Sequence, residues 1–231
     1  MWDKVTHEDW EIFFKTDEKI LNPYHHGHQD FYSFVLYDDG IPVIVDSGGA
    51  SYDDTNKFSR IVKFAECHNT LLIDNLGYKP KSIKYLPNDY WETNFSYEYK
   101  KNDNYVEIRL SCTGFNRIDK SINLSRSIKL SEKTIIIEDH SCSNKTHKIT
   151  NFFHFSPNIK LVQNDGNILV ENVNCNYTFN APKENTMLIN PDDDYKFYSD
   201  KYGINNSKSY IMNDSLINKK SSVIHSLEKI S

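Results

Sequence analysis

Short runs in which apolar and polar residues alternate recur along most of this 231-residue chain. This alternation places the apolar side chains on one face of an extended strand. The clearest runs cover residues 95–99, 106–112 and 122–130, although Arg126 interrupts the third. Further strand-like segments lie at residues 134–138, 149–155, 167–170, 177–179 and 222–227. Many short strands separated by polar turns predict a β-sandwich or a β-barrel.

Two apolar segments near the N-terminus predict a β-hairpin. Residues 31–37 and 42–46 flank the turn sequence Asp38-Asp39-Gly40. Both segments are apolar on both faces, which predicts that the hairpin is covered from two sides. In the simplest register, Asp46 pairs with Ser33.

One helical pattern interrupts the strands. Phe58, Ile61, Val62 and Ala65 follow the i, i+3, i+4, i+7 spacing of an amphipathic helix that leads to His68. Regular alternation of strands and helices is absent from the sequence, which argues against a parallel α/β fold. We therefore predict one all-β domain over residues 1–231, a sandwich or a barrel with one short helix.

Charge and composition exclude several classes of protein. The formal net charge of −5 argues against a nucleic-acid partner. No segment has the roughly 20 apolar residues of a membrane span. The N-terminal residues 1–14 lack the basic start and apolar run of a signal peptide, so we expect a cytoplasmic chain or a piece of a longer exported one. The four cysteines form no CxxC pair, which excludes a zinc ribbon, and we expect them to be buried.

The densest cluster of reactive side chains lies just before the predicted hairpin. His25, His26, His28 and Asp30 occur within six residues. Alternate residues of an extended segment share a face, so His26, His28 and Asp30 can point the same way. Imidazole and carboxylate groups are good ligands for zinc and related ions.

Asp46 and His68 are two further candidate ligands. Asp46 ends the second hairpin segment, and His68 begins another strand-like run. Each has an ordinary alternative: an Asp before Ser-Gly-Gly is often a turn residue, and a single His before a strand is often a core or surface residue. A straight strand would hold His28 too far from Asp46, so the chain must bend, with Gly27 as the expected hinge.

The order of these motifs resembles that of the heparinase II/III-like polysaccharide lyases. Residues 26–34 are similar to that family's HxHxDxxSF segment, residues 46–52 to its DxGxxxY segment, and residues 68–70 to its HNT motif. Arg60 also fits the family pattern, and Tyr202-Gly203 resembles a late YG segment. The resemblance covers nearly the whole chain. Phe64 departs from it, because the family often has an Arg there.

The resemblance implies a fold, a metal site and a partner domain. In that family a large antiparallel β-sandwich, of the supersandwich or jelly-roll kind, packs against an N-terminal helical toroid, and the substrate cleft runs between them. The resemblance implies the same sandwich, with one short helix, for this chain. The corresponding residues here imply that His28, Asp46 and His68 bind a divalent metal, most often zinc, in a structural role. His26 would face the cleft. No segment of this sequence predicts the toroid, which we expect a longer or separate chain to supply.

The resemblance also implies an activity, the β-elimination of uronate-containing polysaccharides. In this reaction a base removes the C5 proton beside the carboxylate and an acid protonates the leaving oxygen. His26 would carry a proton or donate to the carboxylate, or it would only orient a metal ligand. Since the family's toroid supplies other catalytic groups, we expect weak or no lyase activity from these 231 residues alone.

Two other classes of function remain open from the sequence. A carbohydrate-binding module without chemistry would use exposed aromatic rings, for which Tyr85, Tyr90 and Trp91 are candidates if they do not pack in the core. A cupin-like metalloenzyme would use the pair His26 and His28. Cupins usually add a glutamate a few residues later, and none occurs here before Glu66.

Overall fold

The computed structural model describes residues 1–16, 27–50, 55–80, 93–164, 166–182, 187–189, 194–200 and 206–230. A four-stranded antiparallel sheet contains its strands in chain order. These strands are β1 (Trp2–His7), β2 (Trp10–Lys15), β3 (Phe34–Asp38) and β4 (Ile41–Ile44). The expected hairpin is β3–β4, with an irregular register between Leu36 and Tyr37.

A second antiparallel sheet contains ten strands of the described chain, eight of them in the order β10-β11-β12-β16-β9-β8-β7-β6. Its strands are β5 (Leu71–Ile73), β6 (Phe95–Lys101), β7 (Val106–Cys112), β8 (Asn123–Leu130), β9 (Thr134–His154), β10 (Lys160–Asn164), β11 (Asn167–Glu171), β12 (Asn176–Asn180), β13 (Met187–Ile189) and β16 (Tyr210–Ile230). Strand β13 pairs with β16, and β5 pairs with β9. Two short strands, β14 (Phe197–Tyr198) and β15 (Asn206–Ser207), pair separately.

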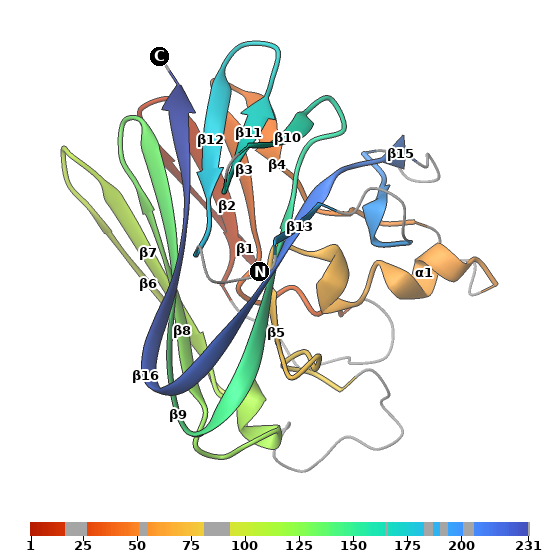
Figure 1. Cartoon of the computed structure of the whole chain (residues 1–231), viewed down its shortest axis with the longest axis vertical. Coiled ribbons are helices and arrows are strands. Elements are labelled where there is room, and N and C mark those ends of the chain that lie inside the picture. Colours follow the sequence, from red (N-terminus) through yellow and green to blue (C-terminus); the bar gives the residue numbers. More distant parts are fainter. Residues whose placement is uncertain are drawn as a thin grey trace.

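The four-stranded sheet (the small sheet) and the ten-stranded sheet (the large sheet) are the two layers of a sandwich (Figure 1). Alternate residues of the small sheet, including Trp10 and Phe14, point into the core and are fully buried. Alternate residues of the large sheet, such as Ile108 and Ile137, meet them. The expectation of an all-β antiparallel sandwich is confirmed.

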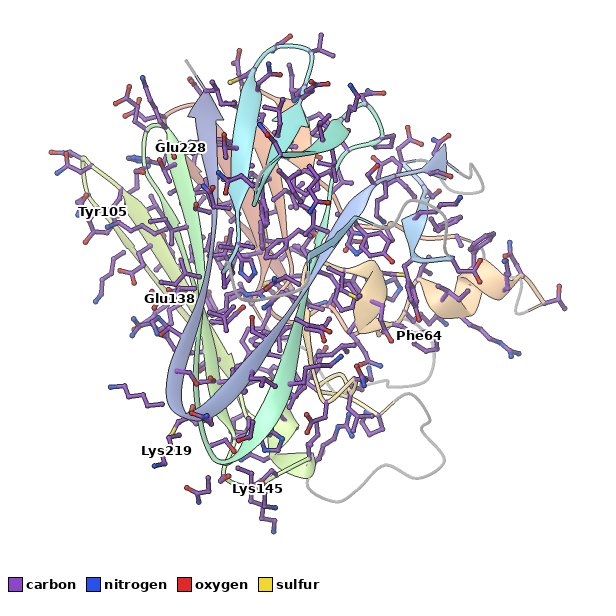
Figure 2. All side chains as sticks on the ribbon, viewed as in Figure 1. Phe64, Tyr105, Glu138, Lys145, Lys219 and Glu228 are labelled. Atoms are coloured by element: carbon purple, nitrogen blue, oxygen red, sulfur yellow. The ribbon has the colours of Figure 1, made fainter. Side chains whose placement is uncertain are left out.

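Strands β9 and β16 form the central pair of the large sheet, and each is 21 residues long. The sequence predicted two strands where β9 is continuous, because its polar middle interrupts the apolar pattern. This middle part lies where both strands bend, at the end of the molecule marked by Lys145 and Lys219 (Figure 2). The other end of β9, at His154, reaches the candidate site.

The predicted helix is shorter than its apolar spacing suggested. Helix α1 covers Lys57–Ile61, with the Asn56 side chain accepting a hydrogen bond from the backbone of Phe58. Phe64 is extended, and a 3₁₀ helix, Ala65–Cys67, then leads to His68. The break in the helix lets the chain turn into the core while Ala65 remains buried.

Other expectations need correction. Strands β1, β2 and β10 were not predicted. Val35 and Tyr37 on the outer face of β3 are only half-buried, whereas the consecutive residues Val43 and Ile44 of β4 are both buried. The second face of the hairpin is therefore covered only in part. Cys67 and Cys112 are buried, whereas Cys142 is exposed. No helix in the described ranges is long and apolar enough to span a bilayer.

Candidate metal centre

Three chain segments meet around His68. His28 precedes a tight turn, in which the backbone nitrogen of Ser33 donates to the carbonyl of Asp30 at 3.1 Å. Tyr32 in this turn has a φ of 69°, a left-handed conformation that is uncommon for a non-glycine residue. The sequence predicted Gly27 as the hinge, but the structure places a turn three residues later. This turn directs His28 toward the segment after β4.

Asp46 and His68 are in direct contact. Oδ2 of Asp46 lies 2.6 Å from Nδ1 of His68, whose side chain is fully buried. The other carboxylate oxygen of Asp46 accepts a hydrogen bond of 2.9 Å from the backbone of Gly48. Asp46 is therefore both the turn residue of the ordinary alternative and a partner of His68.

His28 lies beside the same imidazole. The ring centroids of His28 and His68 are 5.2 Å apart, with an angle of 39° between the planes. The structure therefore brings His28, Asp46 and His68 together.

The charges in this cluster are shared unequally. Burial, and then the neighbouring His68, lower the pKa of His28 from 6.5 to about 4. Burial disfavours the charged forms of Asp46 and His68. The opposite charge of each residue, and the hydrogen bond between them, outweigh this penalty for its partner. The pKa of Asp46 is therefore lowered and that of His68 is raised. The cluster thus contains a neutral imidazole and an ionised carboxylate, both of which are metal ligands.

One nitrogen in the cluster lacks a protein partner. Nε2 of His68 is buried and has no hydrogen-bond partner among the described residues. A buried polar atom of this kind calls for a ligand, an ion or water. The donor types and this free nitrogen fit a divalent cation. The described residues nevertheless contain no group of three His, Cys, Asp or Glu side chains already arranged to hold a metal ion.

Lys208, which no sequence pattern predicted, lies behind the Asp46 loop. Its side chain is buried, and Nζ donates to the carbonyl of Phe197 at 2.7 Å and to Oγ of Ser47. Ser47 in turn donates to the carbonyl of Cys67 at 2.5 Å. Burial lowers the pKa of Lys208 to about 8. The sequence around this lysine, Ser-Lys-Ser, carries no motif, and its contact with Ser47 is purely tertiary.

A buried polar network holds the residue after His68. The side-chain amide of Asn69 donates to the carbonyls of Phe34 at 2.7 Å and Val45 at 3.0 Å. The backbone carbonyl of Asn69 accepts from Arg126, which forms a fully buried ion pair of 2.8 Å with Asp139. Charged residues at two core-facing positions of alternating strands were the sequence feature that could have revealed this pair.

Several residues singled out by sequence lie outside the described residues. These are His25, His26, Tyr52, Tyr85, Tyr90, Trp91, Tyr202 and Gly203. Neither the catalytic role of His26 nor the aromatic sugar-binding platform is therefore tested by the geometry. Both remain predictions.

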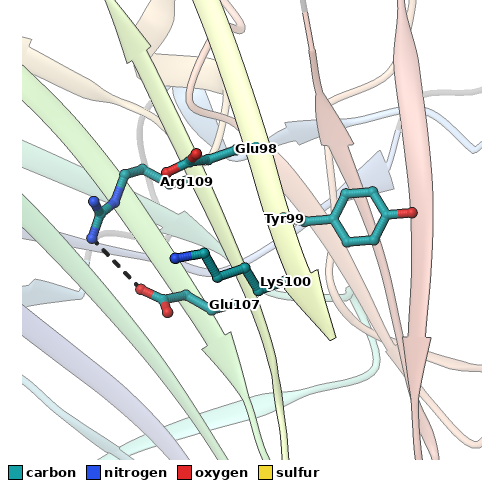
Figure 3. A pocket seen from close by; sticks show the side chains of 5 residues that line it. All are labelled: Glu98, Tyr99, Lys100, Glu107 and Arg109. Carbon is teal, nitrogen blue, oxygen red and sulfur yellow. Dashed lines mark ion pairs between the residues drawn. The ribbon is translucent and has the colours of Figure 1, made fainter. Parts of the chain in front are cut away.

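A hollow elsewhere on the surface is too small to compete as a site. It lies on β6 and β7 and is lined by Glu98, Tyr99, Lys100, Glu107 and Arg109 (Figure 3). Its volume of about 20 Å³ accommodates about one water molecule. Arg109 and Glu107 form an ion pair of 3.7 Å across it, so its charges are already matched.

Solved structures with similar folds include several lyases. A heparan sulfate lyase, HepC, from Pedobacter heparinus matches with a TM-score of 0.75 and 12% identity, over 96% of this chain and 33% of that protein. The heparinase III BT4657 gene product matches with a TM-score of 0.72 and 14% identity, over 96% of this chain and 33% of that protein. The chain thus spans about a third of the length of these proteins.

A second group of similar folds matches along its whole length. A putative aldose 1-epimerase from Escherichia coli K12 has a TM-score of 0.51 and 10% identity, with 100% of this chain and 99% of that protein covered. At such identities, the likeness concerns the fold alone. No protein with a curated description matches the sequence.

The sequence itself matches a family. The family described as "Heparinase II/III-like, C-terminal" matches residues 2–222, which include all three predicted metal ligands. The chain therefore belongs to the heparinase II/III-like family of polysaccharide lyases, in which it corresponds to the C-terminal domain.

Proposed function

We propose that this chain is the metal-binding part of a polysaccharide lyase that cleaves uronate-containing glycans by β-elimination. The observation that carries the proposal is the convergence of His28, Asp46 and His68 from three separate segments, with 2.6 Å between Asp46 and His68. Similar proteins that are named as a heparan sulfate lyase and as heparinase III support an acidic polysaccharide substrate.

His28, Asp46 and His68 would hold the ion, which we expect to be zinc in a structural role. His28 offers a neutral nitrogen because burial lowers its pKa, and Asp46 offers an ionised carboxylate. A zinc ion bound here would cross-link the segment before β3, the loop after β4 and the end of the 3₁₀ helix. The direct contact between Asp46 and His68 would have to open if both residues were ligands of one ion.

His26 is the residue of this chain that we place nearest the reacting sugar. The reaction needs a base for the C5 proton, an acid for the leaving glycosidic oxygen, and neutralisation of the uronate carboxylate. An imidazole titrates near neutral pH, so His26 could carry a proton or donate a hydrogen bond to the carboxylate. A helical toroid from a longer or separate chain would supply the other groups.

The test combines a binding titration and a product assay on one sample. Uronate-containing oligosaccharides are titrated into the chain, and ultraviolet absorbance then reports unsaturated uronate products. We expect binding with weak or no product formation by the chain alone. With a helical partner domain added, product should form, and His26→Ala should abolish it. The matched control is His25→Ala, which removes the neighbouring imidazole and should leave product formation unchanged.

Three results would contradict the proposal. Glycan binding with no product, even at high protein concentration and with a helical partner domain added, would instead support a carbohydrate-binding module. Failure of the wild-type chain to bind any uronate oligosaccharide, both alone and with a helical partner domain added, would exclude both the lyase and the binding module. Rapid turnover by the chain alone would contradict the expected need for a toroid.

A further inference from the structure

A second group of ionisable side chains lies at the end of the molecule remote from His68. Asp74 follows β5, Asp119 follows the 3₁₀ helix Gly114–Arg117, and His147 lies near the bend of β9. Lys145, two residues before His147, marks this end (Figure 2). Seven strand positions separate His147 from His154, roughly 20 Å at the usual rise of a strand. The group is therefore distinct from the candidate metal centre.

The ring of His147 is held by Asp74. Oδ2 of Asp74 lies 2.6 Å from Nδ1 of His147, and Oδ1 accepts from the backbone nitrogen of Lys148 at 2.8 Å. An ionised carboxylate only accepts hydrogen bonds, so Nδ1 of His147 carries a hydrogen and Nε2 is the ring atom that can bind a metal ion. A carboxylate on one ring nitrogen is the usual support for a histidine that binds metal through the other.

Nε2 of His147 points at Asp119. The His147 side chain is 7% exposed, and Nε2 has no hydrogen-bond partner in the described ranges. Oδ2 of Asp119 is also buried, and it lies 3.6 Å from Nε2 of His147. The backbone and hydroxyl of Ser121 donate to the other oxygen of Asp119 at 2.8 Å each, and they lower the pKa of this carboxyl.

The separation between these two atoms decides the interpretation. At 3.6 Å it exceeds the usual 2.7–3.2 Å of an N–H···O hydrogen bond. Two ligands at about 2.0–2.2 Å from one zinc ion, at an angle of about 110–120°, lie roughly 3.3–3.7 Å apart. The observed spacing, which also falls within the range of a His–Asp ion pair, fits two donors to one ion.

We propose that Nε2 of His147 and Oδ2 of Asp119 bind a divalent transition-metal ion of the zinc class, with Asp74 orienting the imidazole. The described residues offer two protein ligands and no third, so water completes the coordination. Such a site binds more weakly than a structural zinc site with four protein ligands. Binding would join the turn after β5, the loop before β8 and the bend of β9.

The ammonium group of Lys145 competes with the ion for the carboxylate of Asp119. Its Nζ lies 3.1 Å from Oδ2 of Asp119, but its side chain is 75% exposed. Exposed ion pairs of this kind contribute little to stability. An incoming cation can therefore displace the lysine, and Lys145→Met should tighten metal binding by removing the competing charge.

The test is a calorimetric titration with zinc or cobalt ions alone, in wild-type chain and in the His68→Ala background. We expect His147→Ala and Asp119→Asn to abolish the binding event that persists without His68. Asp74→Asn should weaken it about 10- to 100-fold. The matched control is His140→Ala, which removes a histidine on β9 that is 38% exposed, and it should change nothing.

The outcome is independent of the proposed lyase function, because the His68 variant removes only the first centre. Unchanged binding in both His147→Ala and Asp119→Asn would overturn the proposal. If those variants fail to fold, crystals of wild-type chain grown with zinc give the answer. Anomalous density between His147 and Asp119 supports the site. If zinc fully occupies another position in the same crystals and no density lies between these two residues, the proposal is overturned.

Discussion

Nη1 of Arg126 donates a hydrogen bond of 2.9 Å to the backbone carbonyl of Asn69, the residue that follows His68. The same guanidinium group forms a fully buried bidentate pair with Asp139 and donates to the side chain of Asn151. The side-chain amide of Asn69 in turn donates hydrogen bonds to the backbone carbonyls of Phe34, in β3, and Val45, just after β4. The ion pair at the centre of the sandwich is therefore connected directly to the segment that carries the candidate metal centre.

The buried bidentate pair predicts a strong energetic coupling between Arg126 and Asp139. Removing one partner, as in Arg126→Met or Asp139→Asn, leaves an uncompensated polar group in the core and should cost about 3–5 kcal/mol. The double variant Arg126→Met/Asp139→Asn should cost less than the sum of the two single changes. Urea unfolding of the four proteins measures the coupling energy. Strictly additive costs would contradict a direct buried pair.

Gly48 should be the most sensitive glycine of the Asp46 loop. It has a φ of +72°, and a Cβ there would overlap the backbone carbonyl oxygen of Ser199. Left-handed strain and overpacking together predict a loss of about 2–5 kcal/mol for Gly48→Ala. Gly49→Ala is the matched control, since a Cβ at Gly49 meets no atom within 4 Å.

The same pair of variants links the loop to the metal centre. The backbone nitrogen of Gly48 donates to Asp46, so Gly48→Ala should also weaken zinc binding, whereas Gly49→Ala should not. Thermal unfolding and zinc titration provide the two readouts. Equal stability and equal affinity in the two variants would rule out this role for Gly48.

His225 should make the fold sensitive to mild acid. Burial lowers its pKa from 6.5 to about 3, so the unfolded chain binds a proton more readily than the folded chain in this range. Stability should therefore fall as the pH drops from about 6.5 toward 3. Between pH 7 and pH 5 this group should contribute a loss of about 2 kcal/mol.

The contribution of His225 is isolated by comparing variants. His225→Leu should reduce the difference in unfolding free energy between pH 7 and pH 5 by about 2 kcal/mol. His140→Leu, at a partly exposed position of the adjacent strand, is the control. An unchanged pH difference in His225→Leu would show that the buried histidine is not responsible.

Local patterning explains which strands the sequence could predict. In β7, buried and more exposed residues alternate over its whole length, so the strand is visible without tertiary information. Strands β1 and β2 were missed because a turn at Glu8 and Asp9 joins them without glycine or proline. The polar bend of β9 also hid one long strand, since pairing with β16 supplies hydrogen bonds that the sequence pattern does not reveal.

The sequence could predict those residues of the candidate centre that belong to short local motifs. His28, Asp46 and His68 each occur in a short motif, and the structure brings them together. Lys208 has no such motif, and its contact with Ser47 depends on how distant parts of the chain pack. The pairing of His147 with Asp119 is likewise a product of the fold, because the two lie on different elements.

One ion shared by three side chains is the central expectation for this domain. An anomalous difference map at the zinc edge, from crystals of wild-type chain grown with zinc, tests it directly. We predict a peak about 2.0–2.2 Å from donor atoms of His28, Asp46 and His68, and we expect His68→Ala to lose this peak and to unfold at a lower temperature. The absence of a peak beside these residues, or a metal ion that still fully occupies this same position in His68→Ala, would contradict the shared ion.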